Sequence, residues 1–382
     1  MSVFSPAQVS RYKRHLFLEG VGPEGQERLL GARVLIVGVG GLGCPASLYL
    51  AAAGVGHLAL VDFDRVDLSN LQRQVLYDTG DVGRSKVEVA AERLGALNPD
   101  VQIEQISEKL EASNAEKILQ GYDVIVDGTD TFPSRYLMND VCVWSGMPLV
   151  SGSIQRFEGH VIVFDARRGP CYRCLFPEPP PPELAPDCAT AGVLGVLPGV
   201  VGTLEATEVI KLVLGKGEPL VGKLLVYDAL AMEFRTFTVP KDPDCVVCGK
   251  NPSIREPIDY EQFCAAAQGE AAKIDVPELD PQELRQRLAS GEDLLLLDVR
   301  ERFEWEVARI EGARLVPLRE LSGRLAELES WRKRLVVVHC YKAARSHQAC
   351  QFLLSKGFEQ VTKLRTGIDG WSLDVDASVP RY

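Results

Sequence analysis

Ten cysteines make sulfur chemistry the first possibility that the sequence offers, and their spacing separates them into groups. Four of them form two Cys-x-x-Cys pairs, Cys171 with Cys174 and Cys245 with Cys248. Each pair brings two thiolates within reach of one cation, and two pairs complete the tetrahedral set that structural zinc prefers. Redox activity is the competing interpretation of a single pair. Two pairs favour zinc, which would tie distant parts of one domain together.

Cys340 stands in a context that predicts a reactive sulfur. It ends the apolar run RLVVVHC, and the polar stretch CYKAARS leads from it past Arg345 into a helical pattern. A loop between a strand end and a helix start can direct backbone N–H groups and the helix dipole at one sulfur, which lowers a thiol pKa below about 8.5. A buried structural cysteine is the alternative. The polarity of the loop favours the reactive thiolate.

A glycine-rich turn predicts a phosphate-binding site in the first third of the chain. The β-branched run at residues 34–37 is followed by a G-x-G-x-x-G pattern made of Gly38, Gly40 and Gly43, with Gly41 as a further bare backbone position. The N–H groups at the start of the next helix can then approach phosphate oxygens closely. A second expected strand, HLALVDFD, ends at Asp62 and Asp64. An acidic residue at this distance usually receives a ribose hydroxyl, which NAD, FAD and ATP share.

The residues that follow this strand favour ATP over NAD. Hydride transfer needs a flat slot and a proton donor, whereas nucleotidyl transfer needs cations around the phosphates and a carboxylate for magnesium. Arg73, Lys86 and Asp130 supply those residue types after the expected strands. Solvated surface charges are the alternative interpretation of the two cations. A NAD-dependent reductase remains the rival class of enzyme.

Two α/β segments are expected to position these residues. Residues 1–250 alternate apolar runs with helical patterns, which predicts a Rossmann-like domain. Residues 251–278 show no sustained periodicity and are predicted to be a partly ordered linker. Residues 279–382 resume a smaller α/β pattern, with a capped helix at DPQELRQRLAS, buried strands at LLLLDVR and RLVVVHC, and a helix at RSHQACQFLLSKGF. The proline-rich stretch FPEPPPPELAPDCATAG, which carries Cys188, is predicted to be a mobile loop over the active site.

Composition excludes several classes of partner. A net charge of −11 argues against nucleic acid, because no basic stripe is present to release counterions from phosphates. The most apolar later stretch carries Pro198, Glu205 and Glu208, which argues against a membrane span and favours a buried helix. The first residues, MSVFSPAQVSRYKRH, lack an apolar signal core, so we expect a cytoplasmic protein.

Several motifs in order resemble the MoeB/ThiF family of ubiquitin-activating-type adenylyltransferases, among them RYKRHLFLEGVGPEGQERL, GVGGLGCPASLYLAAAGVGHLALVDFDRVDLSNLQRQ, VGRSKVE and CYRCLFP. The resemblance implies adenylation, with ATP and magnesium, of the C-terminal Gly-Gly of a β-grasp sulfur-carrier protein similar to MoaD or ThiS. It also implies the same structural zinc. It implies ATP or magnesium contacts from Gly41, Asp62, Asn70, Arg73, Lys86 and Asp130, and from Arg14 reaching into a second subunit of a homodimer. Thr131 stands where the family usually shows asparagine, which puts one nucleotide contact in doubt.

The last hundred residues resemble a single rhodanese domain, in the segments LLLLDVRERFEWEVARIEGARLVPL, VVVHCYKAARS and LRTGIDGW. The resemblance implies a persulfide on Cys340, with Arg345 holding the anionic sulfur donor, a persulfide or thiosulfate. The loop is one residue shorter than in related phosphatases, which favours sulfur over phosphate. Two residues depart from the family pattern, Ala343 for glycine and Arg309 for histidine. The first is expected to tighten or distort the loop.

The fusion as a whole resembles MoeZ-type molybdopterin-synthase adenylyltransferase/sulfurtransferases. We expect the persulfide on Cys340 to attack the acyl-adenylate, and Cys188 to release the thiocarboxylate by thiol–disulfide exchange. Cys188 is alternatively a spectator, or the site of a stable thioester in a lysine-ligating enzyme. The rhodanese part is alternatively an inert docking module beside an adenylating domain. The remaining cysteines are assigned to packing: Cys44, Cys142, Cys264 and Cys350.

Overall fold

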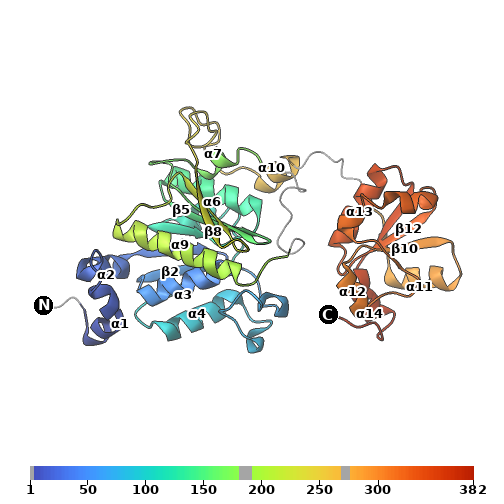
Figure 1. Ribbon diagram of the computed structural model, residues 1–382, viewed down its shortest axis with the longest axis horizontal. Helices are drawn as coiled ribbons and strands as arrows, with labels where there is room; N and C mark the ends of the chain where they lie inside the picture. Colours follow the sequence, from blue (N-terminus) through green and yellow to red (C-terminus); the bar gives the residue numbers. More distant parts are fainter. Residues whose placement is uncertain (1–3, 180–191, 268–275) are drawn as a thin grey trace. The chain divides into compact units, whose positions relative to one another are not determined.

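The computed structural model describes residues 4–179, 192–267 and 276–382, and divides the chain into two compact units, Met1–Glu270 and Ala271–Tyr382 (Figure 1). The predicted boundaries at residues 250 and 278 remain predictions. Most of the proline-rich stretch, including Cys188, lies outside the described residues. Within the described ranges, no helix is long and apolar enough to cross a membrane.

The first unit is built on an eight-stranded sheet with the order β3-β2-β1-β4-β5-β6-β7-β8. The pairs from β3 to β5 are parallel, and the pairs from β5 to β8 are antiparallel. Its strands are β1 (Arg33–Val37), β2 (His57–Val61), β3 (Gln102–Ile106), β4 (Val124–Asp127), β5 (Leu149–Gln155), β6 (Glu158–Phe164), β7 (Lys223–Asp228) and β8 (Glu233–Thr238). Its helices are α1 (Pro6–Leu16), α2 (Gly22–Gly31), α3 (Gly43–Ala53), α4 (Lys86–Leu97), α5 (Ala115–Leu119), α6 (Phe132–Ser145), α7 (Tyr172–Leu175), α9 (Leu197–Leu214) and α10 (Tyr260–Ala267), with short 3₁₀ turns η1 (Leu68–Asn70) and η2 (Thr79–Asp81).

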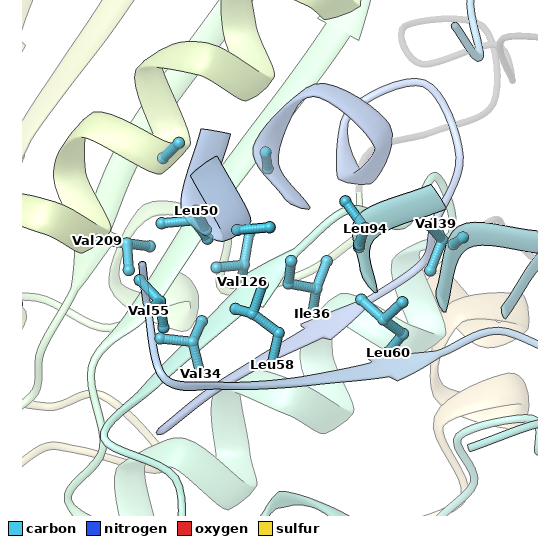
Figure 2. Close-up of a cluster of buried hydrophobic side chains, with 14 of the residues drawn as sticks. Val34, Ile36, Val39, Leu50, Val55, Leu58, Leu60, Leu94, Val126 and Val209 are labelled. Atoms are coloured by element: carbon cyan, nitrogen blue, oxygen red, sulfur yellow. The ribbon is translucent and has the colours of Figure 1, made fainter. Parts of the chain in front are cut away.

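Strand β1 lies in the interior of this sheet, and both of its faces are apolar. Successive side chains of a strand point to opposite faces. Val34 and Ile36 accordingly join the core formed with α3, α4 and α9, part of which Figure 2 shows. Leu35 and Val37 join the opposite core, formed with α5, α6 and α10. The predicted Rossmann-like α/β fold with helices on both faces is therefore confirmed.

The order of the strands reverses direction at β1. The chain goes from β1 outward to β2 and β3, and then returns to the other side of β1 as β4. Open α/β sheets bind ligands at such a switch point, beyond the carboxyl ends of the strands. The glycine turn follows β1 and the segment with Asp130 follows β4, so the two predicted nucleotide-binding segments leave the sheet at neighbouring positions.

Helix α10 lies within the predicted linker and packs on the first unit. Its Tyr260 and Cys264 are buried against α6, and the Tyr260 hydroxyl donates to Asp140 Oδ2 at 3.1 Å. Phe263 packs edge-on against Tyr136, with ring centroids 5.1 Å apart. These contacts place ordered, packed structure beyond residue 250.

The second unit is a five-stranded parallel sheet with the order β11-β10-β12-β13-β9, and helices on both faces. The helix α13 packs in one core with Val336 and Val338, and α11 and α14 pack in the other core with Val337. The predicted capped helix, two buried strands and helix after Cys340 are all present. The elements are β9 (Glu278–Leu279), α11 (Pro281–Ala289), β10 (Leu294–Asp298), α12 (Arg302–Val307), β11 (Arg314–Leu315), η3 (Leu318–Glu320), η4 (Leu325–Trp331), β12 (Leu335–His339), α13 (Ala344–Ser355), β13 (Gln360–Leu364) and α14 (Gly367–Asp374).

Candidate functional site

The glycine turn is held in a conformation that larger residues could not adopt. Gly38 has φ +87°, and a Cβ on Gly43 would lie 2.0 Å from the Gly38 carbonyl oxygen. A Cβ on Gly128, which follows β4, would lie 2.4 Å from the same oxygen. The backbone beyond β1 therefore touches both the start of α3 and the backbone beyond β4. This close approach is the geometry that a phosphate-binding turn requires.

Asp62 is bonded to this turn. Its carboxylate accepts hydrogen bonds from the N–H groups of Val39 and Asp64, each at 2.8 Å. Burial raises the pKa of Asp62, and the charge of Lys86 opposes that rise. The carboxylate lies at the carboxyl end of β2, next to the turn after β1, where a ribose is received in this architecture.

Three further predicted residues lie along the segment that follows β2. A Cβ on Gly41 would lie 3.8 Å from Arg73 Cδ, so the arginine adjoins the glycine turn. Asn70 ends η1, where its side-chain oxygen accepts from the Asp67 N–H at 3.4 Å. Lys86 is 5% exposed, and its ammonium donates to Asp64 Oδ2 at 2.8 Å. The ion pair between Lys86 and Asp64 was not predicted from the sequence.

Asp130 lies exposed between β4 and α6, on a segment whose backbone is held by hydrogen bonds to buried side chains. Fully buried Asp127 accepts from the Thr129 N–H at 3.0 Å and from the Ser151 hydroxyl at 3.0 Å. Arg135 donates to the Thr129 carbonyl oxygen at 2.9 Å and lies 3.6 Å from Asp127 Oδ2. An exposed carboxylate on a braced turn suits a magnesium ligand, because hydrated Mg²⁺ is held by one or two carboxylates.

Glu205, on α9, is a fully buried carboxyl group behind this segment. A Cβ on Gly152 would lie 2.6 Å from its carboxyl carbon, so only glycine in β5 leaves it room. Among the described residues, neither carboxyl oxygen has a hydrogen-bond partner. Burial, reinforced by the charge of Asp127, raises the pKa of Glu205 well above its usual value. The surroundings of Glu205 therefore disfavour its ionised form.

Arg14, the remaining predicted nucleotide contact, lies outside the segments that follow β1, β2 and β4. It is exposed in the last turn of α1. Within the described part of the chain it makes no hydrogen bond or ion pair. This position leaves its guanidinium available to a second molecule.

The four cysteines of the two Cys-x-x-Cys pairs converge on one point, and their sulfur atoms all lie within 4.8 Å of one another. Cys171 Sγ lies 3.9 Å from Cys174 Sγ and 3.6 Å from Cys245 Sγ, and Cys174 Sγ lies 3.4 Å from Cys248 Sγ. Tetrahedral zinc with bonds of about 2.3 Å places its sulfurs about 3.8 Å apart, so the cluster fits zinc. Four cysteines leave no open position, which indicates a structural site.

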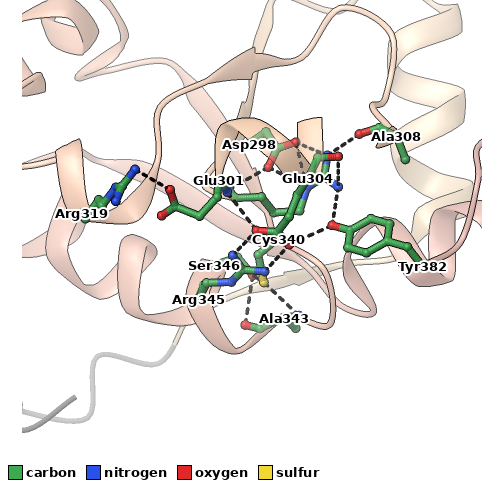
Figure 3. Close-up of polar contacts among 11 residues, drawn as sticks. Asp298, Glu301, Glu304, Ala308, Arg319, Cys340, Ala343, Arg345, Ser346 and Tyr382 are labelled. Atoms are coloured by element: carbon green, nitrogen blue, oxygen red, sulfur yellow. Dashed lines mark hydrogen bonds and ion pairs between the residues drawn. The ribbon is translucent and has the colours of Figure 1, made fainter. Parts of the chain in front are cut away.

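The cysteine loop of the second unit follows β12 as predicted. Cys340 is only 1% exposed, and its sulfur accepts a hydrogen bond from the Ala343 N–H at 3.2 Å (Figure 3). The thiol lies 3.6 Å from the Ser346 hydroxyl, at the start of α13. The reactive role of Cys340 stays a prediction, because its burial is also typical of a packed cysteine.

Ala343 occupies the position where a glycine is usual, and the backbone there is strained. Its φ of +89° is in the left-handed region, which costs an alanine about 1–2 kcal/mol. A glycine at this position would relieve the strain. The greater conformational entropy of its unfolded chain would offset about 0.5–1 kcal/mol of that stabilisation. We expect Ala343→Gly to raise the free energy of unfolding of the second unit by about 0.5–1 kcal/mol, measured by denaturant titration.

The matched control is Ala349→Gly, within α13 and fully buried, which should lower the same free energy by about 1 kcal/mol or more. A destabilised Ala343→Gly variant would contradict the assignment of strain to this loop.

Sequence reasoning missed the main partner of Arg345. Its guanidinium donates to both carboxylate oxygens of Glu304, with Nη1 to Oε2 at 2.5 Å and Nη2 to Oε1 at 2.7 Å. The sequence held one indication of where Glu304 lies, because Glu301 and Glu304 have the spacing of a capping box at the start of α12. Arg309, at the position of the usual histidine, lies over the ring of Trp305 at 6.0 Å.

The four cysteines assigned to packing are all buried, which agrees with that assignment: Cys44, Cys142, Cys264 and Cys350. Burial raises the pKa of Cys44 and Cys350 to about 12 and that of Cys264 to about 11. These thiols stay protonated near pH 7 and are poor nucleophiles.

Comparison with known proteins agrees with both halves of this picture. Residues 12–247 match the ThiF family, and residues 280–374 match the rhodanese-like domain. The probable adenylyltransferase/sulfurtransferase MoeZ of Mycobacterium tuberculosis is 45% identical over 386 residues, which cover 100% of this chain and 97% of that protein. A sulfur carrier protein adenylyltransferase of Thermus thermophilus is 55% identical over 262 residues, covering 67% of this chain and 97% of that protein.

A solved structure shares the fold of the first unit. The crystal structure of E. coli MccB with ATP is 26% identical, has a TM-score of 0.56, and covers 62% of this chain and 74% of that chain. The chain therefore belongs to the ThiF family and carries a rhodanese-like domain after the ThiF region. Both predicted family resemblances are confirmed.

Proposed function

We propose that this enzyme adenylates the C-terminal Gly-Gly of a β-grasp sulfur-carrier protein with ATP, and then transfers sulfur to it from a persulfide on Cys340. The observation that carries the proposal is the meeting of the glycine turn after β1 with the Asp130 segment after β4. Full-length relatives that are adenylyltransferase/sulfurtransferases support the pairing of the two activities on one chain.

In the first stage, the nucleotide would bind beyond the carboxyl ends of β1 and β4. The N–H groups around Gly41 would hold phosphate oxygens, and Asp62 would receive the ribose. Asn70, Arg73 and Lys86 would surround the triphosphate, and Lys86 would exchange its contact with Asp64 for phosphate. Asp130 would hold magnesium, which neutralises phosphate charge and polarises the α-phosphate. The carrier carboxylate then attacks the α-phosphorus and releases pyrophosphate.

In the second stage, the terminal persulfide sulfur of Cys340 attacks the acyl carbon. The carbon–oxygen bond to AMP breaks, AMP leaves, and an acyl disulfide forms. A thiolate attack on the Cys340 sulfur then releases the carrier thiocarboxylate, and Cys188 is the thiolate that we propose. The resulting Cys188–Cys340 disulfide needs an external dithiol reductant before the next turnover.

Several partners belong to the same proposal. An exposed Arg14 supports a homodimer in which the arginine completes the second subunit's ATP site. The cysteine cluster supports one structural zinc in each chain. The sulfur donor would be a persulfide or thiosulfate, and the reduced thiols and ATP that the reaction needs favour a cytoplasmic location.

The first test is carrier-dependent exchange of labelled pyrophosphate into ATP, with β-grasp proteins that end in Gly-Gly. We expect Asp130→Ala to lower the exchange rate by about 10³-fold, because the loss of one charged stabiliser of a transition state costs about 3–4 kcal/mol. The control is Glu116→Ala, an exposed carboxylate of α5 that should leave exchange unchanged.

A carrier without its final glycine should support no exchange. Unchanged exchange in Asp130→Ala would refute the proposed magnesium site. No exchange with any carrier, together with tight binding of NAD, would refute adenylation itself.

A second candidate function has one observation in its favour. The burial of Cys340 fits a rhodanese-like domain that serves only to dock the carrier, beside an active adenylating domain. This alternative predicts thiocarboxylate formation without the Cys340 sulfur.

A further inference from the structure

A chain of polar contacts in the second unit starts from a buried ion pair (Figure 3). Asp298 and Arg300 are both fully buried. The Arg300 guanidinium donates to Asp298 Oδ2 from Nη2 at 2.6 Å and to Oδ1 from Nε at 3.0 Å. Arg300 Nη2 also donates to the Ala308 carbonyl oxygen at 2.8 Å. These contacts fix one guanidinium orientation, because the fork of donors is planar and rigid.

Tyr382 connects this pair to the cysteine loop. Its hydroxyl lies 2.8 Å from Arg300 Nη1 and 2.8 Å from Glu304 Oε1. An arginine can only donate, and a phenol has one proton, so Tyr382 accepts from Arg300 and donates to Glu304. Its ring packs on Tyr341, the residue after Cys340, with centroids 4.7 Å apart.

Glu304 connects the Tyr382 hydroxyl to the Arg345 guanidinium. The carboxylate is nearly buried and accepts from three groups: both guanidinium nitrogens of Arg345, the Tyr382 hydroxyl, and the Glu301 N–H at 2.9 Å. Burial alone would raise the pKa of Glu304, but the hydrogen bonds from Arg345, the Glu301 N–H and Tyr382 lower it overall. The ionised carboxylate therefore holds Arg345 in one defined geometry.

We propose that Tyr382 is a positioning residue of the sulfur-transfer site, which acts through Glu304 to orient the Arg345 guanidinium for the anionic sulfur donor. The inference rests on the proposed function of the second unit. A guanidinium that is already oriented binds an anion without a further loss of side-chain rotamer entropy. The contacts of Tyr382 should therefore raise the affinity of the site for the sulfur donor.

The test is sulfur transfer by the full chain from thiosulfate to cyanide, which releases sulfite and thiocyanate. Tyr382→Phe keeps the ring against Tyr341 and removes only the oxygen. Because a hydrogen bond to a charged group is lost, we expect KM for thiosulfate to rise about tenfold, with kcat changed less than about twofold. Carrier-dependent pyrophosphate exchange should stay at the wild-type rate.

A double-mutant cycle separates positioning from a general structural role. In a Glu304→Ala background, Tyr382→Phe should change KM less than about twofold, since the group it orients is absent. Arg381→Ala is the matched control, because Arg381 is the neighbouring residue but pairs with Asp369. It should leave KM unchanged.

The outcomes separate the two proposals. A wild-type chain that transfers sulfur neither from thiosulfate nor from a small-molecule persulfide would overturn the proposed function of the second unit and this inference with it. An active wild type with an unaltered Tyr382→Phe variant would overturn this inference alone. Equal effects of Tyr382→Phe in both backgrounds would also overturn it, because they would assign the hydroxyl a structural role.

Discussion

Cys340→Ala is expected to lose carrier thiocarboxylate formation by about 10³-fold or more, while carrier-dependent pyrophosphate exchange continues at the wild-type rate. The reason is that the acyl carbon can accept sulfur only from a persulfide, and the variant has no sulfur atom in the loop after β12 to carry one. The residues proposed for adenylation all belong to the first unit, whereas Cys340 belongs to the second, so the loss should be confined to the sulfur-transfer stage. Mass spectrometry of the intact carrier measures the result, through the replacement of one oxygen by sulfur.

The control for this variant is Cys350→Ala. Cys350 is fully buried in α13 of the same unit, and its pKa is raised to about 12, so it cannot substitute as a nucleophile near pH 7. Cys350→Ala should form thiocarboxylate at nearly the wild-type rate. Undiminished product from Cys340→Ala would establish the docking-module alternative, and equal losses in both variants would indicate damage to the fold.

Cys248→Ser is the second variant with a large expected effect, on stability rather than on chemistry. Structural zinc contributes about 10–16 kcal/mol in small peptides, which is about 3 kcal/mol for each of four ligands. For a unit of this size, such a loss corresponds to a fall in Tm of about 10 °C. We expect the variant to bind less than one zinc ion per chain and to melt earlier, measured by metal analysis and calorimetry.

Cys142→Ser provides the comparison, because Cys142 is buried in the same unit but lies outside the sulfur cluster. It should keep one zinc ion per chain, despite the cost of a buried hydroxyl. A strong chelator should lower the Tm of the wild type toward that of Cys248→Ser. A wild-type chain purified without zinc and insensitive to added zinc would refute the structural metal site.

Local patterns in the sequence predicted the elements with the strongest physical signals. The apolar runs of β1, β10 and β12 could only be buried strands, and the glycines after β1 could only mark a close backbone approach. The two Cys-x-x-Cys pairs predicted that their four sulfurs would meet, because two such pairs favour one shared zinc site over redox activity. The capping aspartate Asp280 marked the start of α11 for the same kind of local reason.

Contacts between distant residues could not be predicted in this way. Glu304 and Tyr382 are far apart in the sequence, and no periodicity connects a phenol to a carboxylate across a folded unit. The pairing of Lys86 with Asp64 depends equally on how β2 and α4 pack. Helix α10 was missed for another reason, since an eight-residue helix offers too short a window for its apolar spacing to be read.

Glu205 also changes how the charge of this protein should be counted. The formal value of −11 treats every carboxyl group as an anion. Glu205 departs from that assumption in direction, because burial raises its pKa well above its usual value and so disfavours the anion. The formal charge therefore overstates the anionic character of a carboxyl group that the fold encloses beside Gly152.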